Sequence, residues 1–145
     1  PAEQWQTVMQ TNVNAVFMLN QGLFHLLDQG DPSCVIHVSS SVGLQGRAYW
    51  GAYSASKFAL EGLNQILADE TEIAGNIRVY SVNPGGTRTA MRREAYPLED
   101  PQTLPIPETH MSLFLFLLAG SLLPGHISQP LPATGAQLDA RSWLS

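Results

Sequence analysis

The chain has 145 residues, of which 44% are hydrophobic and 13% charged, a composition typical of one globular domain rather than of a disordered segment. Its formal net charge of -5, from 7 Lys and Arg against 12 Asp and Glu, offers no basic cluster to neutralise phosphates and argues against nucleic acid as a partner. The longest apolar run, Leu113 to Ala119, is too short to cross a bilayer and no secretory signal is recognisable, so we expect a cytoplasmic protein with no membrane partner.

The first predicted element is a long helix from Glu3 to about Asp28. Apolar side chains recur along it at helical spacing, and Gly30-Asp31-Pro32 ends it. A buried strand follows from Cys34 to Val38, because this stretch is short, apolar and rich in β-branched residues. The single cysteine, Cys34, lies in that strand, where a buried and unreactive thiol is the simplest interpretation.

A loop of small residues, beginning with Ser39-Ser40-Ser41, separates this strand from a second helix. The helix is predicted from about Ala52 to Ile73, and its first half is crowded with Ala, Ser and Gly, which let another backbone approach closely. The next buried strand, Ile77 to Val82, opens into Asn83-Pro84-Gly85-Gly86, a strong turn signal.

The C-terminal part is less regular. Prolines and polar residues from Tyr96 to Pro107 predict a loop, and Glu108 to Ala119 is apolar nearly all round, which predicts a buried helix. Beyond it, Gly125-His126-Ile127-Ser128 indicates a short edge strand, and the rest of Leu122 to Ser145 is expected to be irregular. The alternation of helices and strands predicts an α/β domain with a parallel sheet, about half of a doubly wound one.

Tyr53 and Lys57 are the first candidates for chemistry. They lie four residues apart on a predicted helix and therefore share one face. A tyrosine has a pKa of about 10, and a neighbouring ammonium favours the phenolate and lowers that pKa, which makes the pair a usable general acid and base. Taken alone, the pair is a weak signal, and an ordinary surface pair on a helix is the simpler interpretation.

Two polar residues stand where apolar ones are expected. Ser40 ends a buried strand, where open α/β sheets place ligand groups, although Ser39 and Ser41 are placed as well as Ser40. Asn12 lies within the apolar stripe of the first helix and must find a hydrogen-bond partner there. Its amide either ties the helix to a neighbouring backbone or holds a water for proton exchange.

The turn after the second strand lies at the edge of the sheet where cofactors bind. Pro84 and Gly85 allow a tight turn, and Thr87 and Thr89 offer hydroxyl and backbone groups to an amide such as that of nicotinamide. The alternative is a plain turn with Thr89 as the N-cap of a helix. No metal is expected, because no histidine has a partner at metal-ligand spacing among His25, His37, His110 and His126.

Together these motifs resemble the short-chain dehydrogenase/reductase family. In that family an Asn on a helix precedes a Ser after a strand, Tyr-x-x-x-Lys follows thirteen residues beyond the Ser, and a Pro-Gly turn comes last. Ser40 lies thirteen residues before Tyr53, which selects it over its neighbours. The match covers roughly Trp5 to Met91, and Gln45-Gly46-Arg47 and the stretch from Gly85 to Arg92 look most like the YciK-like branch of the family.

The resemblance implies a role for each motif. Tyr53 exchanges a proton with the substrate oxygen, Lys57 lowers the pKa of Tyr53 and holds the nicotinamide ribose, and Ser40 positions the substrate oxygen. Asn12 holds a water in a proton relay that reaches Lys57. The implied cofactor is NAD or NADP, and the implied substrate is a small carbonyl compound or alcohol. The residues expected to bind the cofactor are Tyr53, Lys57, Pro84, Gly85, Thr87 and Thr89, the last four of them against the nicotinamide.

Several parts of the family pattern do not occur in this sequence. These are the Gly-rich turn that takes the pyrophosphate, the residue that selects NAD or NADP, the Asn-Asn-Ala-Gly segment and an Asp-Gly-Gly after the last strand. We therefore expect residues 1–145 to form a partial Rossmann-type domain that lacks its N-terminal dinucleotide-binding half, and we expect this chain alone to be inactive.

Two other functions remain open. The resemblance implies that helices 3–28 and 52–73 pair with their copies in a homodimer or tetramer, so the chain is alternatively a non-catalytic dimerising fragment. A nucleotide-sugar epimerase or dehydratase also contains Tyr-x-x-x-Lys, but the turn from Pro84 to Thr89 and the short C-terminal part argue against that class.

Overall fold

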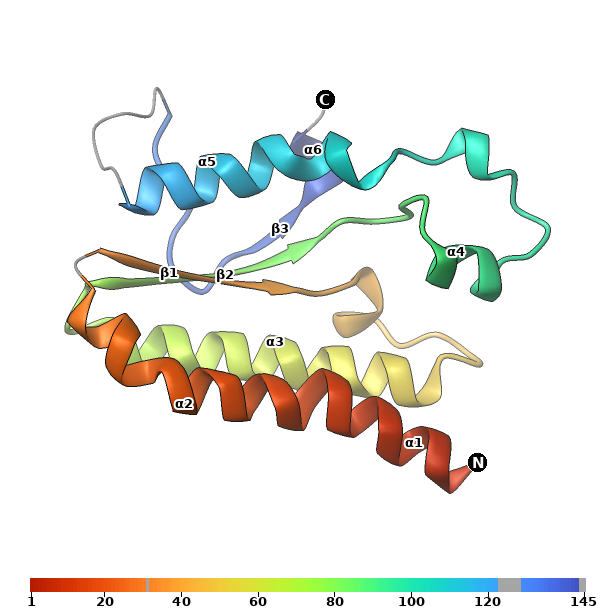
Figure 1. The fold of residues 1–145 in the computed structure, drawn as a ribbon, viewed down its shortest axis with the longest axis horizontal. Coiled ribbons are helices and arrows are strands. Elements are labelled where there is room, and N and C mark those ends of the chain that lie inside the picture. The colour runs from red at the N-terminus through yellow and green to blue at the C-terminus, as the bar shows by residue number, and fades with distance from the viewer. Residues whose placement is uncertain (31, 123–128, 144–145) are drawn as a thin grey trace.

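Parallel strands form the centre of the molecule. A computed structural model describes residues 1–30, 32–122 and 129–143. In this part of the chain β1 (Ser33–Val38), β2 (Ile77–Asn83) and β3 (Gln137–Asp139) form one sheet in the order β1-β2-β3, with both pairs parallel. Helices cover both faces of the sheet (Figure 1). The predicted α/β architecture with a parallel sheet is confirmed.

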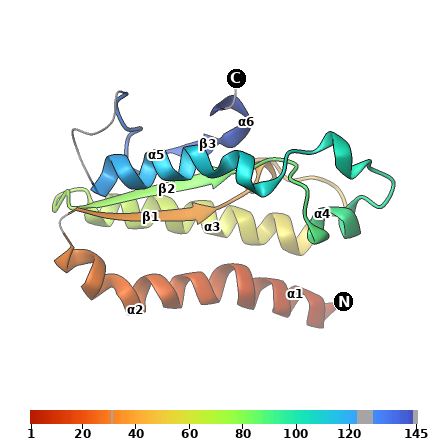
Figure 2. The ribbon, with the colours of Figure 1, turned by 45° about the horizontal axis from the view of Figure 1, so that its top comes forward.

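One face of the sheet is covered by two long helical segments that lie side by side (Figures 1 and 2). The first consists of α1 (Ala2–Met9), the π-helical turn η1 (Gln10–Asn14) and α2 (Ala15–Gln29), which confirms the long helix predicted over 3–28. The second is α3 (Gly51–Thr71), which confirms the helix predicted over 52–73. The π turn, which contains Asn12, is a difference from the regular helix that the sequence predicts, and such turns occur frequently at functional sites.

The core lies on both sides of β2, because alternate side chains of a strand point to opposite faces. Toward α3 the buried cluster consists of Leu67, Ala68, Ile77 and Val79. Toward α5 (Met111–Leu122) it consists of Tyr80, Val82, Leu113, Leu117 and Ala140. Full burial of one Leu or Val side chain contributes roughly 1.5–3 kcal/mol, so packing on both faces fixes the position of β2 and of the turn that follows it.

Helix α5 is buried on one face only. Leu113 and Leu117 are fully buried against the sheet, whereas Leu115 remains 58% exposed and Met111 48% exposed. The predicted helix is present, preceded by the short 3-10 turn η4 (Pro107–His110), but the expectation that it is buried nearly all round is wrong. The reason is that only one side of the helix contacts the sheet in the described part of the chain.

The main predictions included none of four short elements. Strand β3 lies in the stretch expected to be irregular and pairs with β2 through Ser81 to Asn83, and α6 (Ala140–Trp143) follows it. Helix α4 (Ala90–Ala95) follows the turn after β2, as in the alternative with Thr89 as an N-cap, and the predicted loop after it contains the 3-10 turn η3 (Pro101–Thr103). The edge strand predicted over 125–128 lies outside the described residues. Among the helices that the structure describes, none combines the length and hydropathy needed to span a membrane.

Candidate active site

The carboxyl ends of the strands meet at one edge of the sheet, as they must when the strands are parallel. The 3-10 turn η2 (Ser41–Gly43), the first turn of α3 and helix α4 lie beyond this edge (Figure 1). A pocket of about 200 Å³ opens here. Its lining residues are Ser40, Ser41, Val42, Arg47, Trp50, Asn83, Gly85, Gly86, Arg92, Tyr96 and Arg141. This is where open α/β sheets bind ligands.

Ser40, Tyr53 and Lys57 come together beside this pocket. The Ser40 side chain is hydrogen-bonded to Tyr53, which is partly buried on the first turn of α3. One turn further along, Lys57 places its Nζ 5.6 Å from the centre of the Tyr53 ring and donates a hydrogen bond to the carbonyl oxygen of Val38 at 2.8 Å. Helix α3 and the end of β1 are thus joined at the three side chains that the sequence singled out.

The neighbours of Ser40 are placed differently. Ser39 is buried, and its hydroxyl has no hydrogen-bond partner among the described residues. Ser41 is exposed and begins η2, in which the Ser40 Oγ accepts a weak hydrogen bond from the Val42 N–H at 3.5 Å. Of the three serines, the structure therefore brings Ser40 against the tyrosine.

Burial has the largest effect on the pKa values of Tyr53 and Lys57, which both lie on α3. Burial raises the pKa of Tyr53, and the hydrogen bond with Ser40 acts in the opposite direction and lowers it. Burial lowers the pKa of Lys57, and the negative charge of Glu61, one turn further along α3, partly offsets this change. In this structure Ser40, rather than Lys57, is the group that lowers the pKa of Tyr53.

A close approach of two backbones holds η2 against α3. A Cβ atom on Gly43 would lie only 2.9 Å from the backbone oxygen of Lys57 and 3.0 Å from its carbonyl carbon, so any larger residue would force the two elements apart. Ser54 adds a hydrogen bond from its hydroxyl to the Val42 carbonyl oxygen at 2.6 Å. The small residues that the sequence showed here therefore bring Ser40 within reach of Tyr53.

Asn12 connects the long helical segment to α3. Its Nδ2 donates to the Ser56 Oγ at 3.1 Å, and that hydroxyl donates in turn to the carbonyl oxygen of Tyr53 at 2.7 Å. Ser56 is completely buried. The amide thus ties the first helix to the residue that carries the phenol, which is close to the simpler of the two interpretations of Asn12, while its role in a proton relay stays a prediction.

The turn after β2 is held by side chains from β2 and β3. Gly85 adopts a φ of 71°, and its N–H donates to Asn83 Oδ1 at 3.0 Å. Asn83 Nδ2 donates to Asp139 Oδ2 at 3.2 Å, and Asp139 pairs with Arg141 at 2.7 Å. The positive φ explains why glycine occupies position 85, because other residues rarely adopt it.

The remaining residues of the predicted cofactor turn are engaged within the protein. The Thr87 hydroxyl lies 3.0 Å from Nε2 of the buried His110. Thr89 caps α4, since its hydroxyl accepts a hydrogen bond from the Arg92 N–H at 3.1 Å, and this agrees with the N-cap alternative. Of the four residues predicted in the cofactor turn, Gly85 lines the pocket, whereas Pro84, Thr87 and Thr89 are not among its lining residues.

Sequence reasoning proposed none of the pocket's three arginines, Arg47, Arg92 and Arg141, as a site residue. Arg92 forms a two-point ion pair with Glu99, at 2.6 and 2.7 Å, and stacks on the Tyr96 ring at 3.8 Å. Arg141 follows β3 and lies against Gly85. Both depend on α4 and β3, which the sequence pattern did not predict. Trp50 and Tyr96 also line the pocket, whereas Met91 does not and is 64% exposed.

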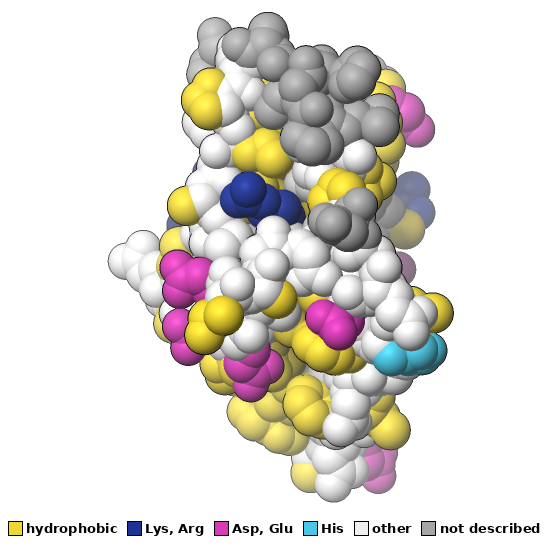
Figure 3. Space-filling model, turned by 90° about the vertical axis from the view of Figure 1, so that its left-hand side faces the viewer, with side chains coloured by type: hydrophobic (Ala, Val, Ile, Leu, Met, Phe, Trp, Pro, Cys, Tyr) yellow, Lys and Arg dark blue, Asp and Glu magenta, His cyan; other side chains and the backbone are white. Residues whose placement is uncertain are grey.

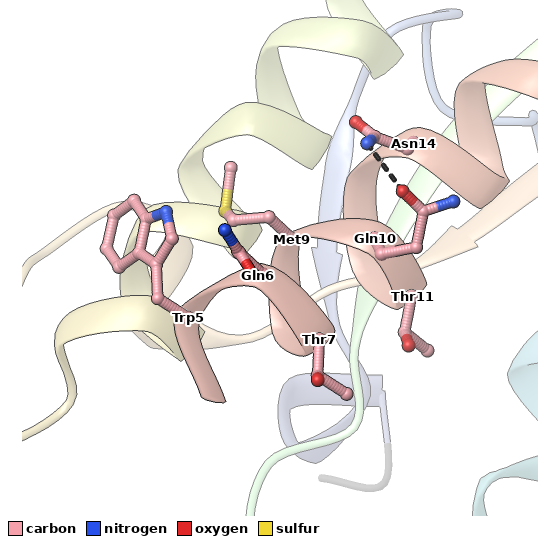
Figure 4. A pocket seen from close by; sticks show the side chains of 7 residues that line it. All are labelled: Trp5, Gln6, Thr7, Met9, Gln10, Thr11 and Asn14. Atoms are coloured by element: carbon pink, nitrogen blue, oxygen red, sulfur yellow. Dashed lines mark hydrogen bonds between the residues drawn. The ribbon is translucent and has the colours of Figure 1, made fainter. Parts of the chain in front are cut away.

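A second and larger concavity, of about 580 Å³, lies along the first helical segment. Figure 4 shows that its seven side chains all come from α1 and η1, where Gln10 accepts a hydrogen bond from Asn14 at 2.8 Å. They are Trp5, Gln6, Thr7, Met9, Gln10, Thr11 and Asn14. None of them is an acid, a base or a strong nucleophile, so we do not place chemistry there. Within the described chain, no group of His, Cys, Asp or Glu is arranged to hold a metal ion.

Known proteins are similar over most of this chain. A family model described as short chain dehydrogenase matches residues 1–100. The uncharacterized oxidoreductase YciK of Escherichia coli K12 is 58% identical over 114 residues, which make up 79% of this chain and 44% of YciK. The chain thus spans less than half of the length of this relative.

Solved structures of short chain dehydrogenases have the same fold over nearly the whole chain. A protein from Shigella flexneri 2a, complexed with NADP, has a TM-score of 0.85 and 49% identity, covering 97% of this chain and 55% of that one. A protein from Escherichia coli CFT073, complexed with NADPH, has a TM-score of 0.86 and 50% identity, covering 97% of this chain and 55% of that one. These matches bear out the Rossmann-type fold predicted from the sequence.

Proposed function

Because the chain belongs to the short chain dehydrogenase family, we propose that it supplies the catalytic residues of an NAD(P)-dependent oxidoreductase that interconverts a carbonyl compound and an alcohol. The observation that carries the proposal is the convergence of Ser40, Tyr53 and Lys57 at the carboxyl edge of the sheet. Two similar structures were obtained with NADP and NADPH, which supports a nicotinamide cofactor for this chain as well.

The proposed roles follow from the contacts of each side chain. Tyr53 gives its phenolic proton to the substrate oxygen during reduction and takes it back during oxidation. Ser40 holds the phenol and stabilises negative charge on the same oxygen. Lys57, whose Nζ lies 5.6 Å from the centre of the ring, holds the nicotinamide ribose. Asn12 anchors the helices and takes part in the proton relay.

The turn after β2 is the proposed contact of the nicotinamide ring. Gly85 presents backbone without a side chain to the pocket, and Asn83 holds the turn in place. The cofactor, when bound, supplies or accepts the hydride. Pro84, Gly85, Thr87 and Thr89 would hold it, the two threonines through their backbone groups, since both hydroxyls are engaged within the protein.

We further propose that residues 1–145 are the catalytic half of a larger Rossmann-type domain and are inactive alone. In the described structure β1 pairs with β2 on one side only, and the segment formed by α1, η1 and α2 has no buried residue. An unpaired strand edge and an incompletely buried helical segment are both expected if further strands and helices of the domain pack against them.

A nucleotide titration tests the proposal most directly. The fluorescence of NADH and NADPH is followed as this chain is added, alone and together with the N-terminal half of YciK from E. coli. We expect no saturable binding by the chain alone, and carbonyl-dependent oxidation of NADPH or NADH by the mixture that is lost in Tyr53→Phe. Turnover by Tyr53→Phe equal to that of the unmodified chain would contradict the assignment of the acid.

A non-catalytic dimerising fragment is the second candidate. The observation in its favour is the number of large apolar side chains that remain exposed on α2 and α3, among them Phe17, Leu19, Leu23, Phe58 and Ile66. Such a surface requires cover in water, and a second copy of the same two helices, in a homodimer or tetramer, provides it. Stable self-association without any nucleotide binding, also in the mixture, would favour this candidate.

A further inference from the structure

We propose that the pocket beside Ser40 and Tyr53 selects a small carbonyl substrate that carries a carboxylate or phosphate group. This inference rests on the proposed function, because it names the substrate class of the same site. Three guanidinium groups line the pocket, those of Arg47, Arg92 and Arg141, and no Asp or Glu is among its described lining residues. The whole chain has only 7 Lys and Arg and a net charge of -5. The pocket lining, with three arginines and no acidic residue, therefore differs in charge from the chain as a whole.

Arg92 is held in position before any ligand arrives. Its Nε and Nη2 bind the two carboxylate oxygens of Glu99, and its plane lies over the Tyr96 ring with 3.8 Å between the guanidinium carbon and the ring centre. The ion pair raises the pKa of Arg92, which stays charged. Arg92 lines the pocket in this fixed position, and a fixed guanidinium binds planar anions with little loss of side-chain entropy.

Arg141 is held in a similar way on the opposite side. Its Nε and Nη2 bind Asp139 at 3.1 and 2.7 Å, and its stem lies over Gly85. Glu99 and Asp139 balance the charges of Arg92 and Arg141 from outside the lining. Arg47, exposed at the rim, has no ion pair with any other residue that the structure describes. The pocket therefore keeps a net positive charge, which favours an anion over a neutral ligand of the same shape.

The walls of the pocket limit the size of its ligand. The Trp50 ring lies 5.5 Å from that of Tyr53 and 5.9 Å from that of Tyr96, so aromatic side chains extend from the proposed acid to the ring under Arg92. The volume of about 200 Å³ is smaller than the roughly 300–1,000 Å³ typical of sites for drug-sized ligands. A compact oxo acid or carbonyl phosphate matches this space better than a large apolar substrate.

The end of the molecule away from the pocket has a different charge distribution. Figure 3 shows Asp and Glu side chains dispersed among hydrophobic and uncharged ones on that face, and in its described part Lys and Arg form no continuous patch. The gathering of guanidinium groups at the pocket is thus not repeated on the described part of this face.

Matched pairs of ligands test the inference without cofactor or turnover. Acetoacetate is compared with its methyl ester, and dihydroxyacetone phosphate with dihydroxyacetone, by following the arginine Nε–H signals of this chain in NMR titrations at low salt. We expect at least one anion to bind at least about tenfold more tightly than its neutral partner and to shift the Arg47 and Arg92 signals. The two pairs distinguish a carboxylate from a phosphate ligand.

Two charge-neutralising variants provide the control. Arg47→Gln is expected to weaken anion binding about fivefold, whereas Arg93→Gln, an exposed neighbour of Arg92 that does not line the pocket, leaves it unchanged. Arg47→Lys should restore part of the affinity, because it keeps the charge and loses the planar fork. Equal loss in Arg47→Gln and Arg93→Gln, equal binding within both ligand pairs, or no saturable binding of either anion would overturn the inference.

Two further outcomes separate this inference from the proposed function. If 2′-phospho-ADP-ribose displaces the small anion, the guanidinium groups belong to a cofactor site and the inference is overturned. If the mixture with the YciK half reduces neutral and anionic carbonyl compounds with equal kcat/KM, the inference fails and the proposed function stands. If anions bind selectively but the mixture never turns over any of these carbonyl compounds, the proposed function fails and the charge selectivity of the pocket stands.

Discussion

Burial and the hydrogen bond with Ser40 have opposite effects on the pKa of Tyr53. Replacing Ser40 by Ala removes the bond that lowers the pKa of Tyr53 and leaves the burial that raises it. We therefore expect the phenolate absorbance of Tyr53 to appear at higher pH in Ser40→Ala than in the unmodified chain. Subtracting the titration of Tyr53→Phe isolates this signal from the other tyrosines. An unchanged midpoint would mean that Ser40 does not contact the phenol in solution.

Gly43 has a steric role that can be measured separately. In Gly43→Ala the new methyl group would meet the backbone of Lys57 at 2.9 Å, and backbone cannot move aside as a flexible side chain does. We expect the free energy of unfolding, measured with urea, to fall by about 1–3 kcal/mol. Gly46→Ala is the matched control in the same loop, because its methyl group would meet only Ser54 Oγ at 3.9 Å. Equal stability of the two variants would contradict the close approach of η2 and α3.

The candidate residues could be predicted from the sequence where they lie in strongly patterned elements. Ser40, Tyr53 and Lys57 stand at the end of an apolar strand and on a long helix, and their spacing is readable without coordinates. Arg141 was not predicted, because its position depends on a three-residue strand that the sequence pattern does not reveal. The contact of Gly43 with Lys57 joins residues distant in the chain, so local pattern carries no sign of it.

Three elements on one face are joined by a buried polar network around His37. The ring accepts a hydrogen bond at Nε2 from Asn20 of α2 at 3.0 Å and donates from Nδ1 to Asn64 of α3 at 2.9 Å. Asn64 donates in turn to the carbonyl oxygen of Gly135, ahead of β3, at 3.3 Å. These partners suit a neutral imidazole, and burial lowers the pKa of His37 despite opposing effects of Asn64 and Glu61.

This network makes stability depend on pH. The folded-state pKa of His37 lies below its ordinary value of 6.5, so below that pH the unfolded chain binds a proton that the folded chain refuses. Stability contributed by neutral His37 is present above pH 6.5 and is lost as the pH falls toward the folded-state pKa, by at most about 1.4 kcal/mol per pH unit.

We expect His37→Gln to remove this contribution to the pH dependence of the urea midpoint between pH 5 and 7.5, roughly one unit either side of the ordinary histidine pKa. Glutamine keeps an acceptor and a donor for the two asparagines but does not titrate. His25→Gln, on the exposed side of α2, should leave the pH dependence as it is. A profile of His37→Gln that matches that of the unmodified chain would refute a titrating role for this network.

Elements were predictable in proportion to their length and periodicity. The long first helix, α3, β1 and β2 all carry a clear repeat, and each was predicted within a few residues of its observed bounds. Helix α4 is six residues long, and its formation depends on the Thr89 cap and on the ion pair of Arg92 with Glu99 rather than on an apolar stripe. The π turn that contains Asn12 could not be predicted, because it barely changes the helical spacing of the apolar residues.

At the scale of the whole molecule, the alternation of elements was enough to predict the parallel sheet, but not which surfaces would be left uncovered. The first helical segment has apolar residues at helical spacing and yet buries none of them completely. Sequence pattern indicates that a face is apolar and does not say which surface covers it.

The exposed helix faces predict self-association. We expect this chain to elute as a dimer or tetramer in size-exclusion chromatography with light scattering, and Leu19→Glu on α2 to shift it toward a monomer. Leu98→Glu is the matched control, because that leucine is fully exposed in the loop beyond α4. A monomeric unmodified chain, or equal dissociation by both variants, would contradict pairing through the two helices.

Within the described residues β1 pairs on one side only, and its open edge affects how readily the protein aggregates in the cell. A strand with an open edge offers a row of backbone donors and acceptors to any extended chain, and this one contains the apolar run Cys34-Val35-Ile36. No proline or lysine within Ser33–Val38 discourages such pairing. A chain that stays without its complementary strand is therefore a substrate for chaperones and a seed for insoluble aggregates, and its solubility should rise when a strand that fits this edge is supplied.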